Sequence, residues 1–160
     1  MYERQRAESI KYLVDHGMAV RVWGNCWQRL SHYSPLLKIE GRGLYNEDMC
    51  KAIGAFKINL GFLRKKSRDL HTTRSSEIPA CSGFMLAERT SEHLAMFNDD
   101  QEAAFFSSNE ELLEKCRYYL AHDDERKAIA AAGHQRCITS DYSNEGMVRK
   151  VLKEILGNKM

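Results

Sequence analysis

The residues best suited to chemistry lie between Asp69 and Leu86, in a polar segment that leads into a short predicted helix and then a strand. Arg74 directly precedes that helix, and its forked guanidinium suits phosphate oxygens. Glu77, expected in the first helical turn, offers two acceptor oxygens to adjacent hydroxyls such as those of a ribose. Because helix N-termini attract anions, the pattern favours a phosphate-and-hydroxyl site. A structural role, with Arg74 paired to Asp69 and Glu77 favoured by the helix dipole, remains the alternative.

The elements that must position this segment alternate between strands and helices. Short apolar runs predict strands at 19–23, 36–39, 58–63, 84–86 and 103–106, and helical spacing or capping residues predict helices at 4–16, 47–55, 75–82, 123–132 and after Ser91, Ser108 and Ser143. Gly133 is expected to end the helix that begins at Asp123. The apolar side of the last helix, around Val148 and Val151, is expected to face the core.

Strands that are continuously apolar and separated by helices predict a parallel sheet covered on both faces. The fold class is therefore α/β, a Rossmann-like three-layer α/β/α arrangement with a mostly parallel sheet. Ligands bind such sheets at the carboxyl ends of the strands, here after Trp23, Leu63, Leu86 and Phe106. The chain opens with a helix where a doubly wound domain normally opens with a strand, so the first strand is short, absent or outside this sequence.

Composition excludes several classes of protein. The chain has 160 residues, and 24 Lys and Arg against 22 Asp and Glu leave a net charge of +2, too little to indicate nucleic-acid binding. No apolar run approaches a membrane span, and the charged N-terminus is not a signal peptide. The five cysteines form no CxxC pair, so we expect reduced thiols in a cytoplasmic protein and no metal site.

Several longer segments resemble one family of enzymes. They are Val20-Arg-Val-Trp-Gly24, Arg74-Ser-Ser-Glu-Ile-Pro-Ala-Cys-Ser-Gly83, Phe105-Phe-Ser-Ser-Asn-Glu-Glu-Leu112, Tyr118-Tyr-Leu-Ala-His-Asp-Asp-Glu-Arg126 and Ile129-Ala-Ala-Ala-Gly-His-Gln-Arg136. Together they are similar to the C-terminal domain of CgeB-like glycosyltransferases, the spore-maturation protein type, which have the GT-B fold. The resemblance covers nearly the whole chain and is strongest over residues 69–137.

The resemblance implies that residues 1–160 form one nucleotide-sugar-binding domain of a longer, bacterial, two-domain protein. A nucleoside diphosphate sugar would be the donor substrate, with no further cofactor and no metal. An N-terminal domain of the same protein would hold the acceptor and the general base, so the isolated chain is expected to be inactive. The full-length protein could associate peripherally with membranes, while the acceptor is unknown.

Carried over residue by residue, the resemblance assigns the ribose hydroxyls to Glu77 and the diphosphate to Arg74. The catalytic residues would be Arg74 and His71. The remaining donor-binding residues would be Asp69 and Thr72 in the loop facing the donor, Gly24, Asn25 and Trp27 after the first visible strand, and Arg4, which matches an arginine following the loop of the first strand.

Two positions depart from the family pattern. Ser76 stands where an aromatic residue is usual, and Ser82 where a glycine is common. The alternative from another functional class is a Rossmann-like or flavodoxin-like module that binds a nucleotide or a partner without chemistry. A phospho-receiver is disfavoured, because Gly24 and Asn25 follow the first visible strand where acidic residues would be needed.

Overall fold

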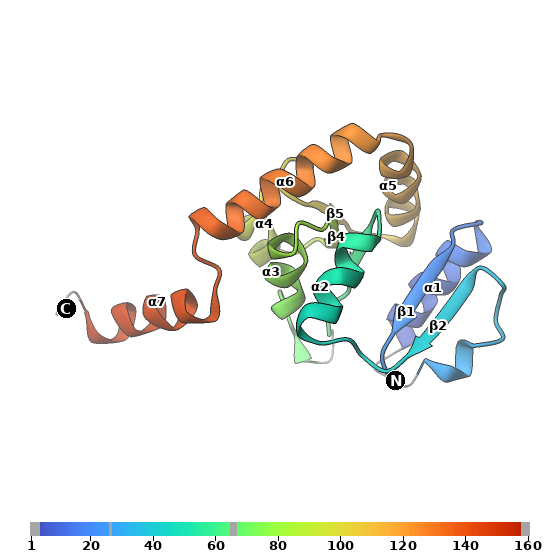
Figure 1. Ribbon diagram of the computed structural model, residues 1–160, viewed down its shortest axis with the longest axis horizontal. Coiled ribbons are helices and arrows are strands. Elements are labelled where there is room, and N and C mark those ends of the chain that lie inside the picture. The colour runs from blue at the N-terminus through green and yellow to red at the C-terminus, as the bar shows by residue number, and fades with distance from the viewer. Residues whose placement is uncertain (1–3, 26, 65–66, 158–160) are drawn as a thin grey trace.

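A computed structural model describes residues 4–25, 27–64 and 67–157, without the side chain of Arg4 (Figure 1). The helices are α1 (Arg4–Asp15), α2 (Asn46–Ala55), α3 (Thr73–Ala80), α4 (Ser91–Met96), α5 (Asn109–Ala121), α6 (Asp123–Thr139) and α7 (Asn144–Leu156), with a 3-10 turn η1 (Gln28–Leu30). The strands are β1 (Val20–Trp23), β2 (Leu37–Gly41), β3 (Asn59–Gly61), β4 (Met85–Glu88) and β5 (Ala104–Phe106).

All strand pairs are parallel, which confirms the predicted α/β class. The strands form two small sheets, one of order β1-β2 and one of order β3-β4-β5. In the first sheet Val20 lies opposite Leu37. In the second, Leu86 of β4 lies between Leu60 and Ala104. The sheet is thus split between β1 and β3 in the described residues.

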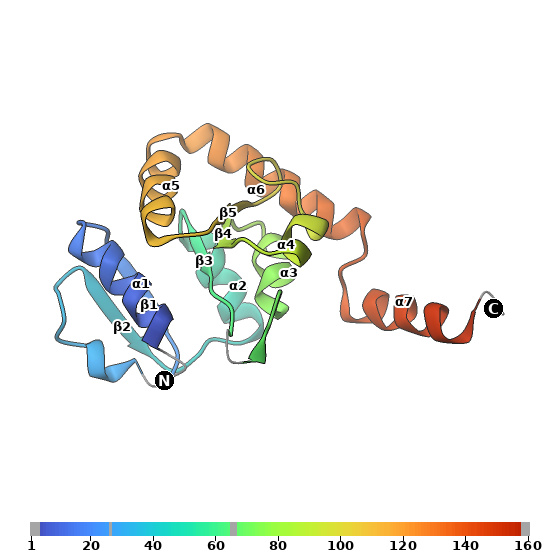
Figure 2. The ribbon, with the colours of Figure 1, turned by 180° about the vertical axis from the view of Figure 1, so that it is seen from behind.

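Strand alternation builds a core on each face of the second sheet. Leu86 of β4 faces a cluster with residues of α1, α5 and α6, whereas its neighbours Met85 and Ala87 face a second cluster with residues of α2, α3, α4 and α6. Figures 1 and 2 show helices on both sides of the strands. The Rossmann-like layering expected from the apolar strands is present.

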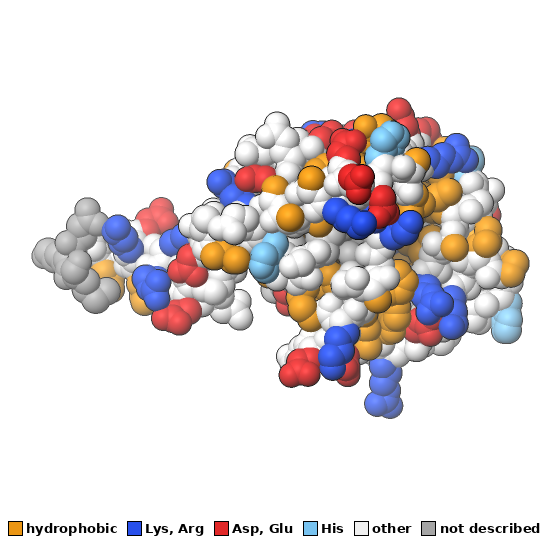
Figure 3. Space-filling model, turned by 45° about the horizontal axis from the view of Figure 1, so that its top comes forward, with side chains coloured by type: hydrophobic (Ala, Val, Ile, Leu, Met, Phe, Trp, Pro, Cys, Tyr) orange, Lys and Arg blue, Asp and Glu red, His pale blue; other side chains and the backbone are white. Residues whose placement is uncertain are grey.

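Helix α7 departs from the expected packing. It begins where predicted, with the Ser143 hydroxyl accepting from the Gly146 N–H, but it projects from the body as an arm (Figures 1, 2 and 3). Five apolar residues that were expected to face inward are exposed instead, as is Leu156: they are Met147, Val148, Val151, Leu152 and Ile155. An amphipathic pattern predicts which side is apolar but not which element covers it. No helix in the described part of the chain is long and apolar enough to cross a membrane.

Gly133 does not end a helix, contrary to expectation. Helix α6 continues through it to Thr139, and a Cβ at this position would collide with the carbonyl oxygen of Glu102 and lie 3.5 Å from the Cβ of Pro79. The glycine is there because α6 crosses closely over the Glu102 backbone and α3. Close packing, and not helix termination, is therefore the reason for a glycine at this position.

The expectation of reduced cysteines is wrong for one pair. Cys50 in α2 and Cys81, which follows α3, form a disulfide with their Cα atoms 5.3 Å apart. Cys116 and Cys137 are free and buried, and Cys26 lies outside the described residues. The scattered spacing concealed the pair, because only the packing of α2 against α3 brings positions 31 residues apart together.

The packing of α6 predicts opposite effects for two glycine substitutions in helices. Gly133→Ala should lower the free energy of unfolding by about 1–3 kcal/mol, because the added methyl overpacks against backbone. Gly54→Ala in α2 meets no atom within 4 Å, and it should raise that free energy by about 0.5–1 kcal/mol through helix propensity. Urea denaturation measures both, and equal effects of the two variants would contradict the close crossing of α6.

The disulfide predicts a stability that depends on reductant. Reduction, or the Cys50→Ser and Cys81→Ser double substitution, should lower the free energy of unfolding by about 2–4 kcal/mol by freeing a long loop in the unfolded chain. Denaturation with and without reductant measures this, and the double variant, which lacks the bond, is the control that should not respond. A wild-type midpoint indifferent to reductant would contradict the pairing.

Candidate functional site

The candidate site forms where the polar segment after β3 enters α3. The helix begins at Thr73, two residues earlier than predicted, because the Thr72 N–H donates to the Ser75 hydroxyl at 3.1 Å in a capping arrangement. Arg74 is therefore the second helical residue. Glu77 lies in the second turn, and its predicted first-turn position was wrong.

A buried histidine holds this helix start in place. The Nδ1 atom of His93 lies 2.6 Å from the Glu88 carbonyl oxygen, and its Nε2 atom lies 2.7 Å from the Ser75 hydroxyl oxygen. Since a carbonyl only accepts, Nδ1 carries the proton, and Nε2 accepts from Ser75. The Ser75 oxygen in turn accepts from Thr72. A continuous chain of hydrogen bonds thus runs from the end of β4 to the N-terminus of α3.

The surroundings of His93 favour its neutral form. The ring is 1% exposed and stacks on Phe105 with ring centroids 5.3 Å apart. Burial lowers the pKa of His93, and nearby His71 lowers it further, while the Glu88 carbonyl and the Glu88 and Glu92 carboxylates act in the opposite direction. Neutral His93 is the form whose Nε2 atom can accept a hydrogen bond from the Ser75 hydroxyl, so burial and hydrogen bonding both favour it.

Arg74 and Glu77 meet on the exposed side of α3. The Arg74 Nη1 atom contacts the Glu77 Oε2 atom and also the Met49 sulfur of α2. Their side chains are 45% and 35% exposed, so both groups remain open to a ligand. The guanidinium and carboxylate form an ion pair between residues three apart on α3, and Glu77, not Asp69, is the carboxylate that Arg74 contacts.

The loop before α3 is tied down at both ends. Asp69 accepts from the Arg64 Nε–H at 2.9 Å. His71 contacts the Glu92 carboxylate through Nδ1, and the Leu70 carbonyl accepts from the Thr90 hydroxyl at 2.6 Å. These contacts connect the loop to α4. Two of the three residues predicted in this loop, Asp69 and His71, therefore each contact a charged side chain.

The turn after β1 lies across from α3. Gly24 has a φ of +130°, and its N–H donates to the Gly41 carbonyl at 2.8 Å. A Cβ on Gly24 would lie 3.6 Å from the Trp27 indole. The indole of Trp27 therefore packs close to the Gly24 backbone. Asn25 is exposed in the same turn. The side chain of Arg4 lies outside the described residues.

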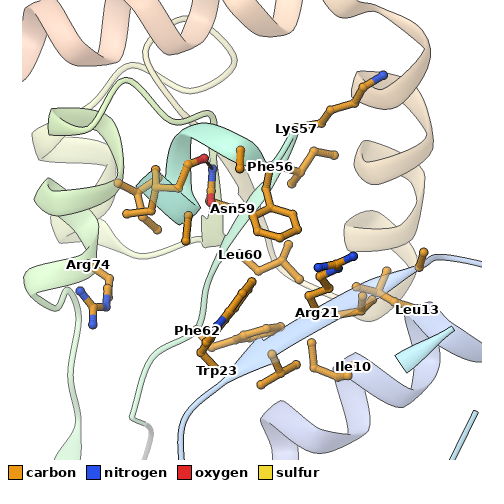
Figure 4. A pocket seen from close by; sticks show the side chains of 18 of the residues that line it. Ile10, Leu13, Arg21, Trp23, Phe56, Lys57, Asn59, Leu60, Phe62 and Arg74 are labelled. Atoms are coloured by element: carbon orange, nitrogen blue, oxygen red, sulfur yellow. Dashed lines mark hydrogen bonds between the residues drawn. The ribbon is translucent and has the colours of Figure 1, made fainter. Parts of the chain in front are cut away.

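A cavity of about 560 Å³ lies between β1 with its following turn and helix α3 (Figure 4). Arg74 and Trp27 both line it, together with Trp23 and Phe62 at the carboxyl ends of β1 and β3. Trp23 also packs edge-on against Phe56, with ring centroids 5.4 Å apart. Figure 4 shows the cavity continuing away from Arg74 toward Leu13 and Lys57.

The structure brings together some of the predicted residues and not others. Arg74, Glu77 and Thr72 share the start of α3, and Trp27 reaches the same cavity as Arg74. Sequence reasoning missed Met49 and the hydrogen bond between Ser75 and His93, because these contacts join segments far apart in the chain. Among the described residues, no group of three or more His, Cys, Asp or Glu side chains could hold a metal ion.

Comparisons with known proteins agree on one kind of enzyme. A family model described as glycosyl transferase-like matches residues 4–153. The solved structure of a glycosyltransferase from Rickettsia africae ESF-5 is similar with a TM-score of 0.66 and 20% identity, over 95% of this chain and 44% of that one. At that identity the likeness shows the fold, and the chain spans less than half of that protein. The chain matches none of the curated proteins with which it was compared.

The burial of His93 predicts a pH dependence of stability. Because its pKa is lowered in the folded state, the unfolded chain takes up the proton first, and stability should fall as pH drops below the ordinary value of about 6.5. Denaturation at pH values above and below that point measures the slope. His93→Gln should flatten it, and His32→Gln, at an exposed position, should leave it unchanged. An equal slope in His93→Gln and wild type would contradict this role.

Proposed function

The chain belongs to the glycosyl transferase-like family, and from this premise we propose that it is the donor-binding domain of a glycosyltransferase. It would bind a nucleoside diphosphate sugar whose sugar is transferred to an acceptor. The observation that carries the proposal is the pairing of Arg74 and Glu77 on the first two turns of α3, where Arg74 lines a cavity that is also lined by Trp23 and Trp27.

The diphosphate would bind where positive charge gathers. Transfer of the sugar leaves an anionic nucleoside diphosphate, so the step requires donors placed where that charge develops. Arg74 offers a forked guanidinium, and the first turn of α3 offers N–H groups and the positive end of the helix dipole. His71 and Thr72, in the loop that enters the helix, would face the same phosphates and the sugar. Asp69 would orient this loop through Arg64.

The nucleoside would bind on the other side of Arg74. The Glu77 carboxylate suits two adjacent ribose hydroxyls, since each oxygen accepts one hydrogen bond. The indoles of Trp23 and Trp27 offer faces for stacking a base, and the turn of Gly24 and Asn25 would line the base or ribose pocket. Arg74 contacts Glu77 in the structure, so each holds the other in place until the donor binds between them.

We propose the same division of labour as in CgeB-like enzymes of the GT-B fold. A second, N-terminal domain of the same protein would hold the acceptor and its general base, and this chain alone would bind the donor without transferring the sugar. The share of the solved glycosyltransferase that this chain covers, 44%, supports that division. Neither a cofactor nor a metal is part of the proposed reaction.

A nucleotide titration of this chain tests the donor site. UDP, GDP and their sugars would be added in turn, and binding would be followed by amide NMR shifts or by calorimetry. We expect saturable binding of nucleotides with one of the two bases. Glu77→Ala should weaken that binding about tenfold or more, because the ribose loses charge-assisted hydrogen bonds. The shifted amides should include Arg74 and Trp27.

Glu114→Ala is the matched control, since it removes an exposed helical carboxylate from α5 and should leave the affinity unchanged. Equal affinities of wild type and Glu77→Ala would exclude Glu77 as the ribose ligand. Absence of saturable binding at millimolar nucleotide, in this chain and in the full-length protein, would contradict the donor-domain proposal and favour a module that binds a partner without chemistry.

A further inference from the structure

The disulfide between Cys50 and Cys81 encloses the segment that forms the candidate site. The two cysteines are 31 residues apart in the sequence. Between them lie all the donor-binding residues predicted in the loop after β3 and in α3: Asp69, His71, Thr72, Arg74 and Glu77. The bond therefore closes the chain into a covalent ring that contains these residues, and its state bears on how firmly they are held.

The first half of helix α2 depends on this bond for its position. Of the ten residues of α2, all of which the structure describes, only Ile53 is buried, and the helix packs mainly against α3. Ile53 shares a core cluster with Ile78, and its carbonyl accepts from the Asn59 side-chain amide at 3.2 Å. These contacts hold the second half of α2. Because so short a helix is marginal without packing, Cys50 is the firm attachment of the first half.

Met49 connects this attachment to the candidate site. It directly precedes Cys50, and its sulfur contacts the Arg74 Nη1 atom. The same Nη1 atom contacts the Glu77 carboxylate. Arg74 is thus held between a carboxylate on its own helix and a side chain next to the disulfide. A displacement of the start of α2 would remove the second of these contacts.

The disulfide is open to attack by a thiol, whereas the free cysteines are protected. Cys50 and Cys81 are each half-buried, while Cys116 and Cys137 are buried. Burial raises the pKa of Cys116 to about 12, and burial together with the Glu102 carboxylate raises the pKa of Cys137 to about 11. Both therefore stay protonated and unreactive near neutral pH. Among the cysteines that the structure describes, the bonded pair is the one suited to exchange.

We propose that Cys50 and Cys81 form a thiol–disulfide switch that controls whether Arg74 is held ready for an anionic ligand. With the bond formed, α2 keeps Met49 against Arg74. With the bond reduced, the start of α2 moves away from α3, and the site binds its anion more weakly. In naming the donor's diphosphate as that anion, the inference rests on the proposed function, whereas the effect on Arg74 follows from the contacts themselves.

The reductant would be a dithiol. One of its thiolates attacks a sulfur of the pair, which forms a mixed disulfide and releases the other cysteine as a thiolate. The second thiol of the reductant then displaces the remaining protein sulfur and closes the reductant's own disulfide. Two electrons and two protons pass from the dithiol to the pair, and one S–S bond forms for the one that breaks. Exchange with an oxidised dithiol reverses each step.

Methyl NMR of the chain in both redox states tests the switch without any ligand. In the oxidised chain a nuclear Overhauser effect (NOE) should connect the Met49 methyl group with the Arg74 side chain. In excess dithiothreitol this NOE should disappear and the Met49 methyl signal should shift. The methyl signal of Met85, which is 1% exposed in β4, is the internal reference and should stay in place. An NOE that persists after reduction would overturn the proposal, and so would loss of the Met85 signal together with that of Met49, because the change would then be general unfolding.

The matched control is the Cys50→Ser and Cys81→Ser double variant. It should lack the NOE in either buffer, and dithiothreitol should not change its spectrum. Alkylation of free thiols followed by mass spectrometry identifies the cysteines that change state. Cys50 and Cys81 should resist alkylation before reduction and react after it, and a pair that reacts equally in both cases would overturn the switch.

Nucleotide binding separates this proposal from the proposed function. UDP and GDP would be titrated into the oxidised chain, the reduced chain and the double variant. Reduction should weaken the affinity at least about fivefold, a coupling of ordinary size between two sites, and the double variant should bind like the reduced chain. Equal affinities in the two redox states would overturn the control of the site by the disulfide. Absence of binding in both states would contradict the donor-binding proposal, while the NOE would still decide the switch.

Discussion

The structure depends most on β4, whose four residues are buried on both faces. Alternation along this strand decides which helices pack on which side of the sheet, and its last residue organises the site. The Glu88 carbonyl accepts from His93, and the Glu88 carboxylate accepts from the Leu63 N–H at 3.3 Å. Buried polar groups are costly unless they are bonded, so these bonds fix both the end of β3 and, through Ser75, the start of α3.

Sequence predicted the elements well wherever a local pattern determines them. The apolar runs at 19–23 and 84–86 became β1 and β4 within two residues, and Ser108 caps α5 by accepting from Glu111 as expected. Predictions failed where contacts between segments far apart in the chain determine the structure. Gly133 was interpreted as a stop because its contact with Glu102 lies in another part of the chain, and the apolar stripe of α7 was assigned to a core that does not reach it.

The contacts of the candidate site also fall into those that local sequence spacing predicts and those that it does not. The contact of Arg74 with Glu77 follows from their spacing of three residues on one short helix, although the sequence pattern placed Arg74 before that helix. The His93–Ser75 bond could not, since 18 residues separate the partners and neither type alone signals the pairing. The Cys50–Cys81 bond was missed for a similar reason. The available signal for the first bond was the position of His93, two residues after the start of a predicted helix that follows a buried strand. Only the packed structure shows that its side chain is buried.

The charged group of Arg74 and apolar residues such as Leu13 and Leu60 line one cavity for a physical reason. Parallel strands end at a common edge, where loops and helix starts gather donors such as Arg74. Directly beneath that edge the interior must be apolar and its backbone groups must be paired. In the gap between β1 and β3 the first condition is met by residues such as Leu13 and Leu60, while the second is not met by the strands described. Arg74 therefore belongs to the rim of loops and helix starts that suits an anion, whereas the apolar residues of the same cavity belong to the interior beneath it.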